Sequence, residues 1–349
     1  MENILIIGGP GTLSGPCAKE LLSLGHKVGL YSHHQFKSPS KKGFAFYFGE
    51  RSDTQALQKA IADSRPTVVI DFICFTMDEA RQMYSLLKPL KTLEHFIFVS
   101  TCDVYGYPLT QLPFSESALF APPVSVYAKQ KREIELFFTE KNETENLPLT
   151  IARPAYSFGD RFLLNIFSRD GGIETFSRIM QGLPVVVMDD GMTLLHASSG
   201  ENTGRMIAQL ATRTYLKREE YTCGHYKAMT HRDYVKLFEN ALEIPAKIEF
   251  VPKTFIESYI RQYPQEGGLV TELTGFNVDF SMQKFAGHFP DFKWRPLQDA
   301  MNTYLSEHQD ELARHTSTGF EDSLLKAYKN ERQRYGEATQ KHGGFMHTD

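Results

Sequence analysis

Residues 3–15 read NILIIGGPGTLSG, and this stretch decides the fold. Its first five residues are almost entirely apolar, which is typical of a strand that is buried on both faces. The glycines Gly8 and Gly11 follow, and a helix-like stretch starts at Ser14. Glycine permits the tight turn that a strand needs before the chain enters a helix. The order of strand, glycine turn and helix predicts the first unit of an α/β fold with a parallel sheet.

Strand-like and helix-like stretches continue to alternate along the first half of the chain. The strand-like runs are continuously apolar, which indicates a parallel sheet covered by helices on both faces. This rhythm predicts a Rossmann-like, doubly wound α/β domain over residues 1–155. The predicted strands are 3–7, 27–31, 44–48, 67–73, 95–99 and 149–152, and the predicted helices are 14–24, 54–62, 77–87 and 124–142.

After Arg153 and Pro154, loops rich in Gly and Pro weaken this rhythm. We expect residues 156–316 to form a smaller C-terminal α/β subdomain that binds the substrate and is interleaved with the first domain. A strand at 184–187 and the helix after it, within 184–212, are expected to return to the main domain. The charged stretch 317–349 should form one exposed helix and a frayed tail. Further predicted helices are 172–181, 201–211, 231–242 and 253–261.

The composition narrows the class of protein. The net charge is −4, which argues against nucleic-acid binding because phosphate contacts need a clustered basic surface. Four cysteines lie far apart without a CxxC pair, so we expect neither disulfides nor a metal site, as in a reducing cytosol. No apolar run reaches the roughly 18 residues of a membrane span, and the first residues do not resemble a signal peptide. We therefore expect a cytoplasmic protein that binds neither nucleic acid nor membrane.

The glycine turn is also a candidate cofactor site. Backbone N–H groups at such a turn can approach a pyrophosphate at the helix N-terminus, where the dipole favours negative charge. Ser14 stands where the dinucleotide fingerprint has its third glycine, so either the helix stands further from the strand or Gly15 makes the close contact. The alternative is a purely structural turn. The predicted contacts are Gly8, Gly11, Thr12 and Leu13.

The end of the second predicted strand bears on the choice of cofactor. An NAD site usually has Asp or Glu there to bond the ribose 2′-OH, but this chain has Ser32 and His33. These residues and the nearby Lys37 could accept the 2′-phosphate of NADP, so the sequence favours NADP slightly over NAD. The alternative is that His33 is an exposed loop residue without this role.

A strand that ends in hydroxyl residues precedes the strongest candidate for chemistry. Residues 96–101, FIFVST, put Ser100 and Thr101 at the edge where open α/β sheets bind ligands. Twenty-six residues after Thr101 comes YAKQK, in which Tyr127 and Lys131 share one helix face. The ammonium and a bound oxidised nicotinamide would favour a phenolate. That phenolate could take a hydroxyl proton while hydride leaves the same carbon.

Four ordered motifs carry a family resemblance: IIGGPGTLSG, FVSTCDVYG, YAKQKREIE and LTIARPAYSFG. Over about residues 3–240 the chain resembles extended short-chain dehydrogenases/reductases of the nucleotide-sugar epimerase/dehydratase branch. The resemblance implies that Thr101 orients the substrate, that Tyr127 is the acid/base, and that Lys131 tunes Tyr127 and holds the nicotinamide ribose. Similar proteins often form a homodimer through the helix of Tyr127 and its neighbour, which leaves a homodimer open for this chain.

The resemblance extends the predicted cofactor site beyond the glycine turn. Glu50 follows the third predicted strand, where the family often has an Asp near the adenine. An aromatic side chain at Phe72 would pack around the cofactor, with core filling as the alternative. The additional cofactor contacts that we expect are Glu50, Arg51, Phe72, Ser100 and Pro154.

Asp103, two residues after Thr101, bears on which reaction the resemblance implies. In sugar 4,6-dehydratases of this branch, that place holds a Glu that acts as a second base. Asp103 could take this role with a side chain one methylene shorter. The alternative is a strand-end Asp that caps a turn.

The substrate side departs from the family pattern. Around His196 the family often has an arginine that clamps nucleotide phosphates and then an acidic pair, and neither is present here. Tyr156 replaces the asparagine of the family's RxxN motif. Arg161 could replace the clamp, with a surface arginine as the alternative. The expected substrate contacts are Tyr105, Tyr156, Arg161 and His196.

Three functions follow as hypotheses. The first is an NAD(P)-dependent nucleotide-sugar epimerase or dehydratase that works through a transient keto intermediate. The second is an NADPH-dependent oxidoreductase of a small carbonyl or secondary-metabolite substrate. The third is a non-catalytic relative that binds a cofactor or nucleic acid. The presence of Thr101, Tyr127 and Lys131 and the negative charge argue against the third.

Overall fold

The computed structural model describes residues 1–33, 43–160, 162–213, 216–317 and 319–342, without the side chains of 264–266 and 335–342. The chain divides into two compact units. Unit 1 comprises Met1–Phe162, Leu194–Met229 and Phe276–Tyr304, and unit 2 comprises Leu163–Thr193, Thr230–Gly275 and Leu305–Asp349. The predicted tail at 343–349 lies outside the described residues.

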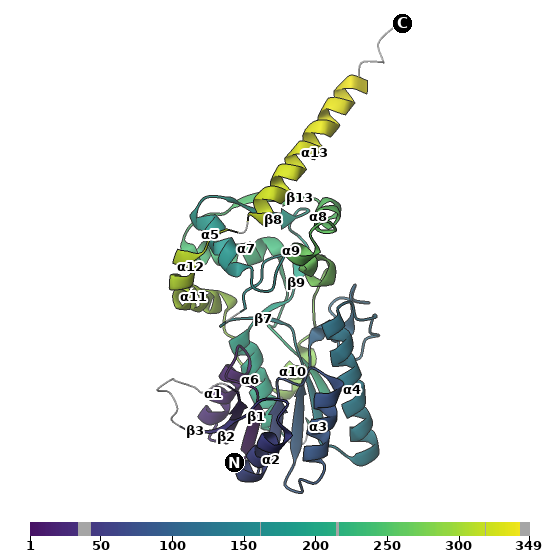
Figure 1. The fold of residues 1–349 in the computed structure, drawn as a ribbon, viewed down its shortest axis with the longest axis vertical. Helices are drawn as coiled ribbons and strands as arrows, with labels where there is room; N and C mark the ends of the chain where they lie inside the picture. The colour runs from purple at the N-terminus through teal and green to yellow at the C-terminus, as the bar shows by residue number, and fades with distance from the viewer. Residues whose placement is uncertain (34–42, 161, 214–215, 318, 343–349) are drawn as a thin grey trace. The chain divides into compact units, whose positions relative to one another are not determined.

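A parallel sheet forms the centre of unit 1 (Figure 1). It has seven strands in the order β11-β6-β5-β4-β1-β2-β3. The strand order reverses between β1 and β4, and open sheets of this kind bind ligands outside the carboxyl ends of the strands at that point. The Rossmann-like, doubly wound fold is therefore confirmed. The strands are β1 (Asn3–Ile7), β2 (Lys27–Ser32), β3 (Phe44–Phe48), β4 (Val68–Asp71), β5 (His95–Val99), β6 (Leu149–Pro154) and β11 (Glu219–Cys223).

Helices of unit 1 begin at residues that cap them. Asp53 accepts backbone bonds at the start of α2 (Thr54–Ser64), and Thr76 with Glu79 forms a capping box at α3 (Met77–Leu87). Leu57, Met83 and Phe138 place α2, α3 and α4 (Val126–Glu145) in one buried cluster with the sheet. The other helices of unit 1 are α1 (Ser14–Ser23), η1 (Cys102–Tyr105), α6 (Gly200–Ala211) and α10 (Gln283–His288), and β7 (Tyr156–Phe158) pairs with β10 (Ala197–Ser199).

The helices α1 and α6 approach each other unusually closely. A Cβ on Gly204 of α6 would lie 2.4 Å from the carbonyl oxygen of Leu13, which precedes α1. Only glycine allows this separation. The contact fixes α6 against the helix that follows the glycine turn.

Unit 2 has its own core. The strands β8 (Pro184–Met188) and β13 (Lys247–Val251) pair in parallel, and their apolar side chains pack with Ile256 of α8 (Lys253–Ile260) and Leu324 of α13 (Phe320–His342). The other elements of unit 2 are α5 (Gly172–Met180), α7 (His231–Leu242), α9 (Pro264–Leu269), η3 (Val270–Thr274) and α12 (Gln309–Arg314). Where the chain passes between units lie β9 (Leu194–Leu195), β12 (Met229–Thr230) and α11 (Leu297–Glu307).

One predicted strand joins a different sheet from the one expected. The strand predicted at 184–187 exists as β8, but it pairs with β13 in unit 2 and does not return to the main sheet. The seventh strand of the main sheet is β11, which the sequence did not reveal. Its first residues, Glu219 and Glu220, are polar and half-buried at the sheet edge, so the apolar run that marks a buried strand is missing. The helix predicted at 201–211 does belong to unit 1, as α6.

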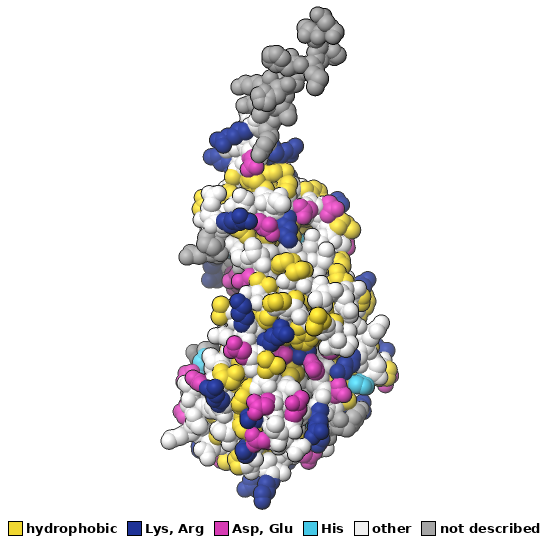
Figure 2. Space-filling model, turned by 90° about the vertical axis from the view of Figure 1, so that its right-hand side faces the viewer, with side chains coloured by type: hydrophobic (Ala, Val, Ile, Leu, Met, Phe, Trp, Pro, Cys, Tyr) yellow, Lys and Arg dark blue, Asp and Glu magenta, His cyan; other side chains and the backbone are white. Residues whose placement is uncertain are grey.

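Charged side chains of both signs lie on the surface of the molecule. On the face seen in Figure 2, Lys and Arg side chains are interspersed with Asp and Glu side chains. Within the described ranges, no helix has the length and apolar character needed to cross a membrane. Among the same residues, no group of three or more His, Cys, Asp or Glu side chains could hold a metal ion.

Candidate active site

The glycine turn connects β1 to α1 at the carboxyl edge of the sheet. Gly8 has φ +92°, and a Cβ there would lie 2.5 Å from the Ile73 side chain that follows β4. Ser14 fills the place of the third fingerprint glycine: its hydroxyl accepts a bond from Gly11 N at 3.0 Å, and Gly9 makes room for it. A Cβ on Gly15 would make only an ordinary 3.5 Å contact, so Gly15 does not take over the close approach.

The start of α1 is suited to an anion. No side chain caps the helix, and the Thr12 hydroxyl donates instead to Gly159 O at 3.1 Å. Among the described residues, a Cβ on Gly11 would meet only Ser14 Oγ, at 3.7 Å, so there is open space beside the turn. Gly15 N donates to Gly11 O at 2.9 Å and Pro16 has no N–H, but a helix N-terminus without a side-chain cap, next to open space, still fits the pyrophosphate of a dinucleotide.

Ser32 and Glu50 meet at the neighbouring strand ends. Ser32 ends β2 and is buried, and its carbonyl accepts a bond from Gly49 N at 3.2 Å. Tyr31 Oη donates to Glu50 O at 2.8 Å, which holds the segment after β3 in place. His33 is exposed beside them, and Lys37 lies outside the described residues. Ser32, His33 and Glu50 therefore share one edge, where the sequence predicted the adenosine end of a cofactor.

Arg51 is turned toward the protein interior. Its guanidinium lies 3.0 Å from Asp71 at the end of β4, donates to Glu79 O at 3.2 Å and also bonds Gln82. Burial raises the pKa of Asp71, and the Arg51 charge opposes that rise. The Arg51 guanidinium thus makes structural bonds, and its predicted contact with a cofactor stays a prediction. The signal for these bonds was Asp71, a carboxylate at the end of an apolar strand, which the sequence analysis missed.

Lys131 joins the carboxyl ends of β4 and β5. Its ammonium donates to Cys74 O and Val99 O, both at 2.8 Å, and lies 4.8 Å from the ring centres of Phe75 and Phe98. Only 1% of the residue is exposed, and burial lowers its pKa to about 8. An ammonium has three donors, so one more is available for a ribose hydroxyl after these two bonds.

Tyr127 lies beside Lys131 as the spacing predicted. Ser125 caps α4 by accepting a bond from Ala128 N at 3.1 Å, which sets Tyr127 in the first helical turn. The phenol ring is 38% exposed and its centre lies 6.3 Å from that of Phe75, the same ring that the Lys131 ammonium contacts. The pair therefore meets around Phe75 at the edge of the sheet.

The end of β5 supplies further polar groups. Thr101 caps η1, and its hydroxyl accepts a bond from Asp103 N at 3.2 Å. The Asp103 carboxylate accepts a bond from Tyr107 Oη, also at 3.2 Å. The Ser100 hydroxyl is 4% exposed and has no hydrogen-bond partner among the described residues. A buried hydroxyl without a partner costs about 1–3 kcal/mol, so a bound ligand would satisfy Ser100.

The remaining predicted cofactor contacts lie at the same strand ends. Phe72 follows β4, is half-buried and donates its N–H to Ile7 O at 3.0 Å. Pro154 is the last residue of β6, which pairs with β5.

Two residues expected to touch the substrate lie in the interior. Tyr105 is fully buried, and its hydroxyl is bonded to Thr222 at 2.7 Å and lies 3.4 Å from Arg153. His196 accepts a bond from Phe280 N at 3.0 Å and contacts His225 O at 2.8 Å through its other ring nitrogen. Both side chains are thus occupied by structural bonds. Their expected substrate contacts are not supported.

Tyr156 and Arg161 are the other two predicted substrate residues. Tyr156 begins β7 and is half-buried. Arg161 lies outside the described residues.

Cys102, next to Thr101, is a packing residue. Its thiol donates to Arg153 O at 3.2 Å, and burial raises its pKa well above the ordinary value. A nucleophilic role is therefore disfavoured.

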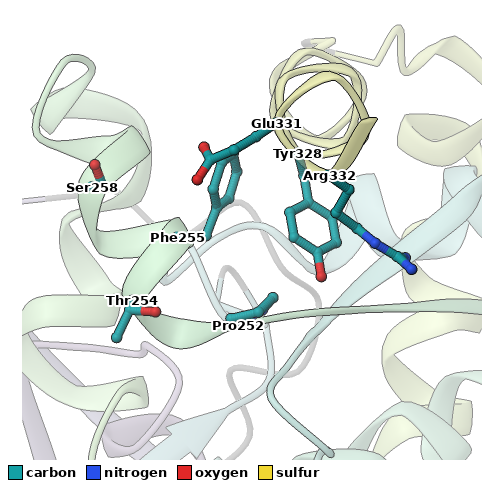
Figure 3. A pocket seen from close by; sticks show the side chains of 7 residues that line it. All are labelled: Pro252, Thr254, Phe255, Ser258, Tyr328, Glu331 and Arg332. Atoms are coloured by element: carbon teal, nitrogen blue, oxygen red, sulfur yellow. The ribbon is translucent and has the colours of Figure 1, made fainter. Parts of the chain in front are cut away.

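A surface pocket in unit 2 carries none of the predicted site residues. Figure 3 shows it between α8 and α13, with Phe255 and Tyr328 in its walls and Glu331 and Arg332 beside them. The side chains there offer no acid/base pair of the kind found around Tyr127. The strand ends of unit 1 remain the candidate site.

Comparison with known proteins identifies a family and several relatives. Residues 4–224 match the model of the NAD dependent epimerase/dehydratase family. Protein CapI of Staphylococcus aureus is 28% identical over 173 residues, which cover 42% of this chain and 52% of that protein. The 2'-dehydrokanamycin reductase of Streptomyces kanamyceticus is 24% identical over 209 residues, or 59% of this chain and 57% of that protein. The chain thus spans little more than half the length of these curated relatives.

Solved structures share the fold. The dTDP-glucose 4,6-dehydratase of Bacillus anthracis, solved with NAD, has a TM-score of 0.69 at 16% identity, covering 89% of this chain and 97% of its own. The UDP-glucuronic acid 4-epimerase of Bacillus cereus, solved with UDP-glucuronic acid and NAD, has a TM-score of 0.65 at 17% identity, covering 88% and 99%.

Proposed function

Because this chain belongs to the NAD dependent epimerase/dehydratase family, we propose that it oxidises a hydroxyl of a nucleotide-sugar to a transient ketone. The product is then an epimer or a dehydrated sugar. The observation that carries the proposal is the meeting of Tyr127 and Lys131 around Phe75, with Thr101 beyond the neighbouring strand end. The similarity in fold to enzymes that act on UDP- and dTDP-sugars supports the substrate class.

A dinucleotide fits the residues that are present. The uncapped start of α1 and the space beside Gly11 suit the pyrophosphate. The Ser100 hydroxyl has no hydrogen-bond partner among the described residues and could bond a polar group of the dinucleotide. Ser32, His33 and Glu50 would hold the adenosine end, and Lys131 the nicotinamide ribose. When bound, the nicotinamide supplies the hydride acceptor and donor.

The chain's own residues handle the protons. Thr101 would hold the substrate oxygen by a hydrogen bond, and Tyr127 would take the hydroxyl proton as the ketone forms. Lys131, held 2.8 Å from two carbonyl oxygens, keeps a positive charge beside the phenol and so favours the phenolate. If the sugar turns over before the hydride and the Tyr127 proton are returned, the product is an epimer.

Asp103 provides the second route. Its carboxylate could remove the proton from the carbon next to the ketone and pass it to a neighbouring hydroxyl, which would leave as water before the hydride is returned. The backbone of Asp103 is bonded to Thr101, so the two groups act from one short turn.

The choice between NAD and NADP rests on few groups. Ser32 and His33 in place of an acidic residue slightly favour NADP. The solved relatives described with NAD favour the other cofactor. Mass spectrometry of the purified protein, read for retained NAD or NADP, separates the two.

The proposed role of Tyr127 has a direct test. Tyr127→Phe removes the acid/base hydroxyl and should lower turnover of UDP- or dTDP-glucose by at least about 100-fold, while retained cofactor stays unchanged. Tyr84→Phe is the matched control, because this tyrosine lies on α3 and bonds Glu145. Full turnover in Tyr127→Phe would sink the proposal.

A second function is a net oxidoreductase of a small carbonyl. It is favoured by the similarity to the 2'-dehydrokanamycin reductase and by the lack of a phosphate-clamping arginine near His196. Such an enzyme consumes NADPH in proportion to product, whereas an epimerase or dehydratase returns its cofactor unchanged. Absorbance of NADPH during turnover distinguishes them.

A further inference from the structure

The Tyr107 side chain has one polar group, its hydroxyl, and this hydroxyl is bonded to Asp103. The Tyr107 hydroxyl donates to Asp103 Oδ1 at 3.2 Å, while the ring is 7% exposed. A carboxylate on a short side chain can rotate about two bonds, and a hydrogen bond to one oxygen restricts where the other one points. The bond therefore orients the group that would act as the second base.

The position of Tyr107 is itself fixed on two sides. The preceding Gly106 has φ +74°, and a Cβ there would lie 2.4 Å from Ala121 O, so the turn admits no larger residue. Ala121 N also donates to Tyr105 O at 2.8 Å, which ties the turn to the following loop. The Tyr107 ring stacks on Phe276, with centres 5.8 Å apart and planes 14° apart.

The backbone of Asp103 is also fixed by a hydrogen bond. Thr101 Oγ1 accepts the Asp103 N–H at 3.2 Å, so main chain and side chain are held by different partners. These partners flank Asp103 in sequence, and the hydroxyl of Thr101 belongs to the proposed site. Asp103 is thus held by two hydrogen bonds, one from its backbone to Thr101 and one from Tyr107 to its carboxylate.

We propose that Tyr107 is a positioning residue that aims the Asp103 carboxylate at the carbon next to the ketone. This inference rests on the proposed function. In the step concerned, the C–H bond beside the ketone breaks, the proton goes to the carboxylate, and the electron pair moves to the ketone oxygen as an enolate. Oxidation of the hydroxyl by Tyr127 and the cofactor precedes this step and does not need Tyr107.

The two steps can be measured separately. With NAD added, UDP-glucose, dTDP-glucose and UDP-glucuronic acid serve as probes in D₂O. Reduction of the nicotinamide during the first turnover, read by its absorbance, reports the oxidation, and deuterium gained at the adjacent carbon reports proton removal. Tyr107→Phe keeps the stacked ring and should slow deuterium gain by about tenfold or more, the loss expected for a bond to a charged group. Nicotinamide reduction should change less than about twofold.

A double-mutant cycle shows whether Tyr107 acts through Asp103. In the Asp103→Asn background, Tyr107→Phe should slow deuterium gain no further. Tyr84→Phe is the control for loss of a tyrosine hydroxyl elsewhere in unit 1. Equal slowing of both steps in Tyr107→Phe, or a further loss in the Asp103→Asn background, would overturn the proposal.

A structural readout keeps the test independent of the substrate. If no probe reduces the nicotinamide with the unmodified protein, the proposed function fails for these substrates. Crystal structures of the unmodified protein and of Tyr107→Phe then decide the role of Tyr107. A displaced Asp103 carboxylate in the variant supports positioning, and an unchanged one refutes it.

Discussion

At the scale of single residues, Lys131 links burial to a pH dependence. Burial lowers its pKa from 10.5 to about 8. Above that pH the ammonium loses its proton, and with it the charge that favours the phenolate of Tyr127. We therefore predict that turnover falls as the pH rises through about 8, measured as initial rates from pH 6 to 10. Lys131→Met should have a low rate without this limb, and Lys129→Met, an exposed neighbour, should keep it. An unchanged rate in the unmodified protein up to pH 9.5 would contradict this role.

The site residues that sequence could predict are those whose spacing has a direct geometric meaning. Tyr127 and Lys131 are one helical turn apart, and Thr101 ends a strand, so their meeting required only the fold. Tyr107 and Asp71 were missed because their significance depends on partners. Tyr107 matters through Asp103 and Phe276, and Asp71 through Arg51. Tyr105 and His196 stay predictions as substrate contacts, because sequence does not reveal that their polar atoms are bonded in the interior.

At the scale of elements, the contact between α1 and α6 predicts a sensitive position. Gly204→Ala would bring a methyl group to 2.4 Å from Leu13 O and push α6 from the start of α1. The free energy of unfolding should fall by about 1–3 kcal/mol, and cofactor affinity should fall with it. Urea denaturation and cofactor titration measure the two effects.

The control for Gly204→Ala is another helical glycine. A Cβ on Gly287 of α10 would have no described atom within 4 Å, so Gly287→Ala should be neutral or stabilise by up to about 1 kcal/mol. Equal stability of the two variants would mean that the close approach of α1 and α6 is not needed.

Most element boundaries could be predicted from sequence, but sheet membership could not. The strands of 3–7 and 95–99 agree with β1 and β5 because continuous apolar runs mark buried strands. The strand of 44–48 agrees with β3, although this strand at the sheet edge is partly exposed. The apolar run of β8 looks like those of β1 and β5, yet its partner is β13. The path of the chain decides which strand a buried apolar run pairs with. The local sequence pattern does not reveal that partner.

At the scale of the whole molecule, buried histidines predict instability in acid. Burial lowers the pKa of His95, His225 and His231 to about 4, from 6.5. Between these values the unfolded chain binds more protons, so the free energy of unfolding falls as the pH drops from 6.5 to 4. Glu321 acts in the opposite sense, because burial raises its pKa from 4.5 to about 7 and the folded state then binds more protons over that range. Because three histidines act against one glutamate, the melting temperature should fall as the pH drops from 6.5 to 4.

A variant tests the origin of this slope. Neither ring nitrogen of His231 has a hydrogen-bond partner among the described residues, and its relative exposure is 2%. His231→Leu should raise the melting temperature at pH 7 and flatten its fall toward pH 4, whereas the exposed His33→Ala should change neither. A melting temperature that rises on acidification, or that is unaffected by His231→Leu, would contradict this account.

The division of unit 1 among three chain segments sets an order of events on the ribosome. β6 ends at Pro154, but its edge partner β11 begins only at Glu219, after the first segment of unit 2 has been made. At about 5–20 residues per second, the edge of β6 waits roughly 3–13 s for its neighbour. An unpaired edge strand is a template for pairing with another nascent chain. Synthesis of this protein therefore passes through an interval in which a chaperone that shields strand edges would have its greatest effect on yield.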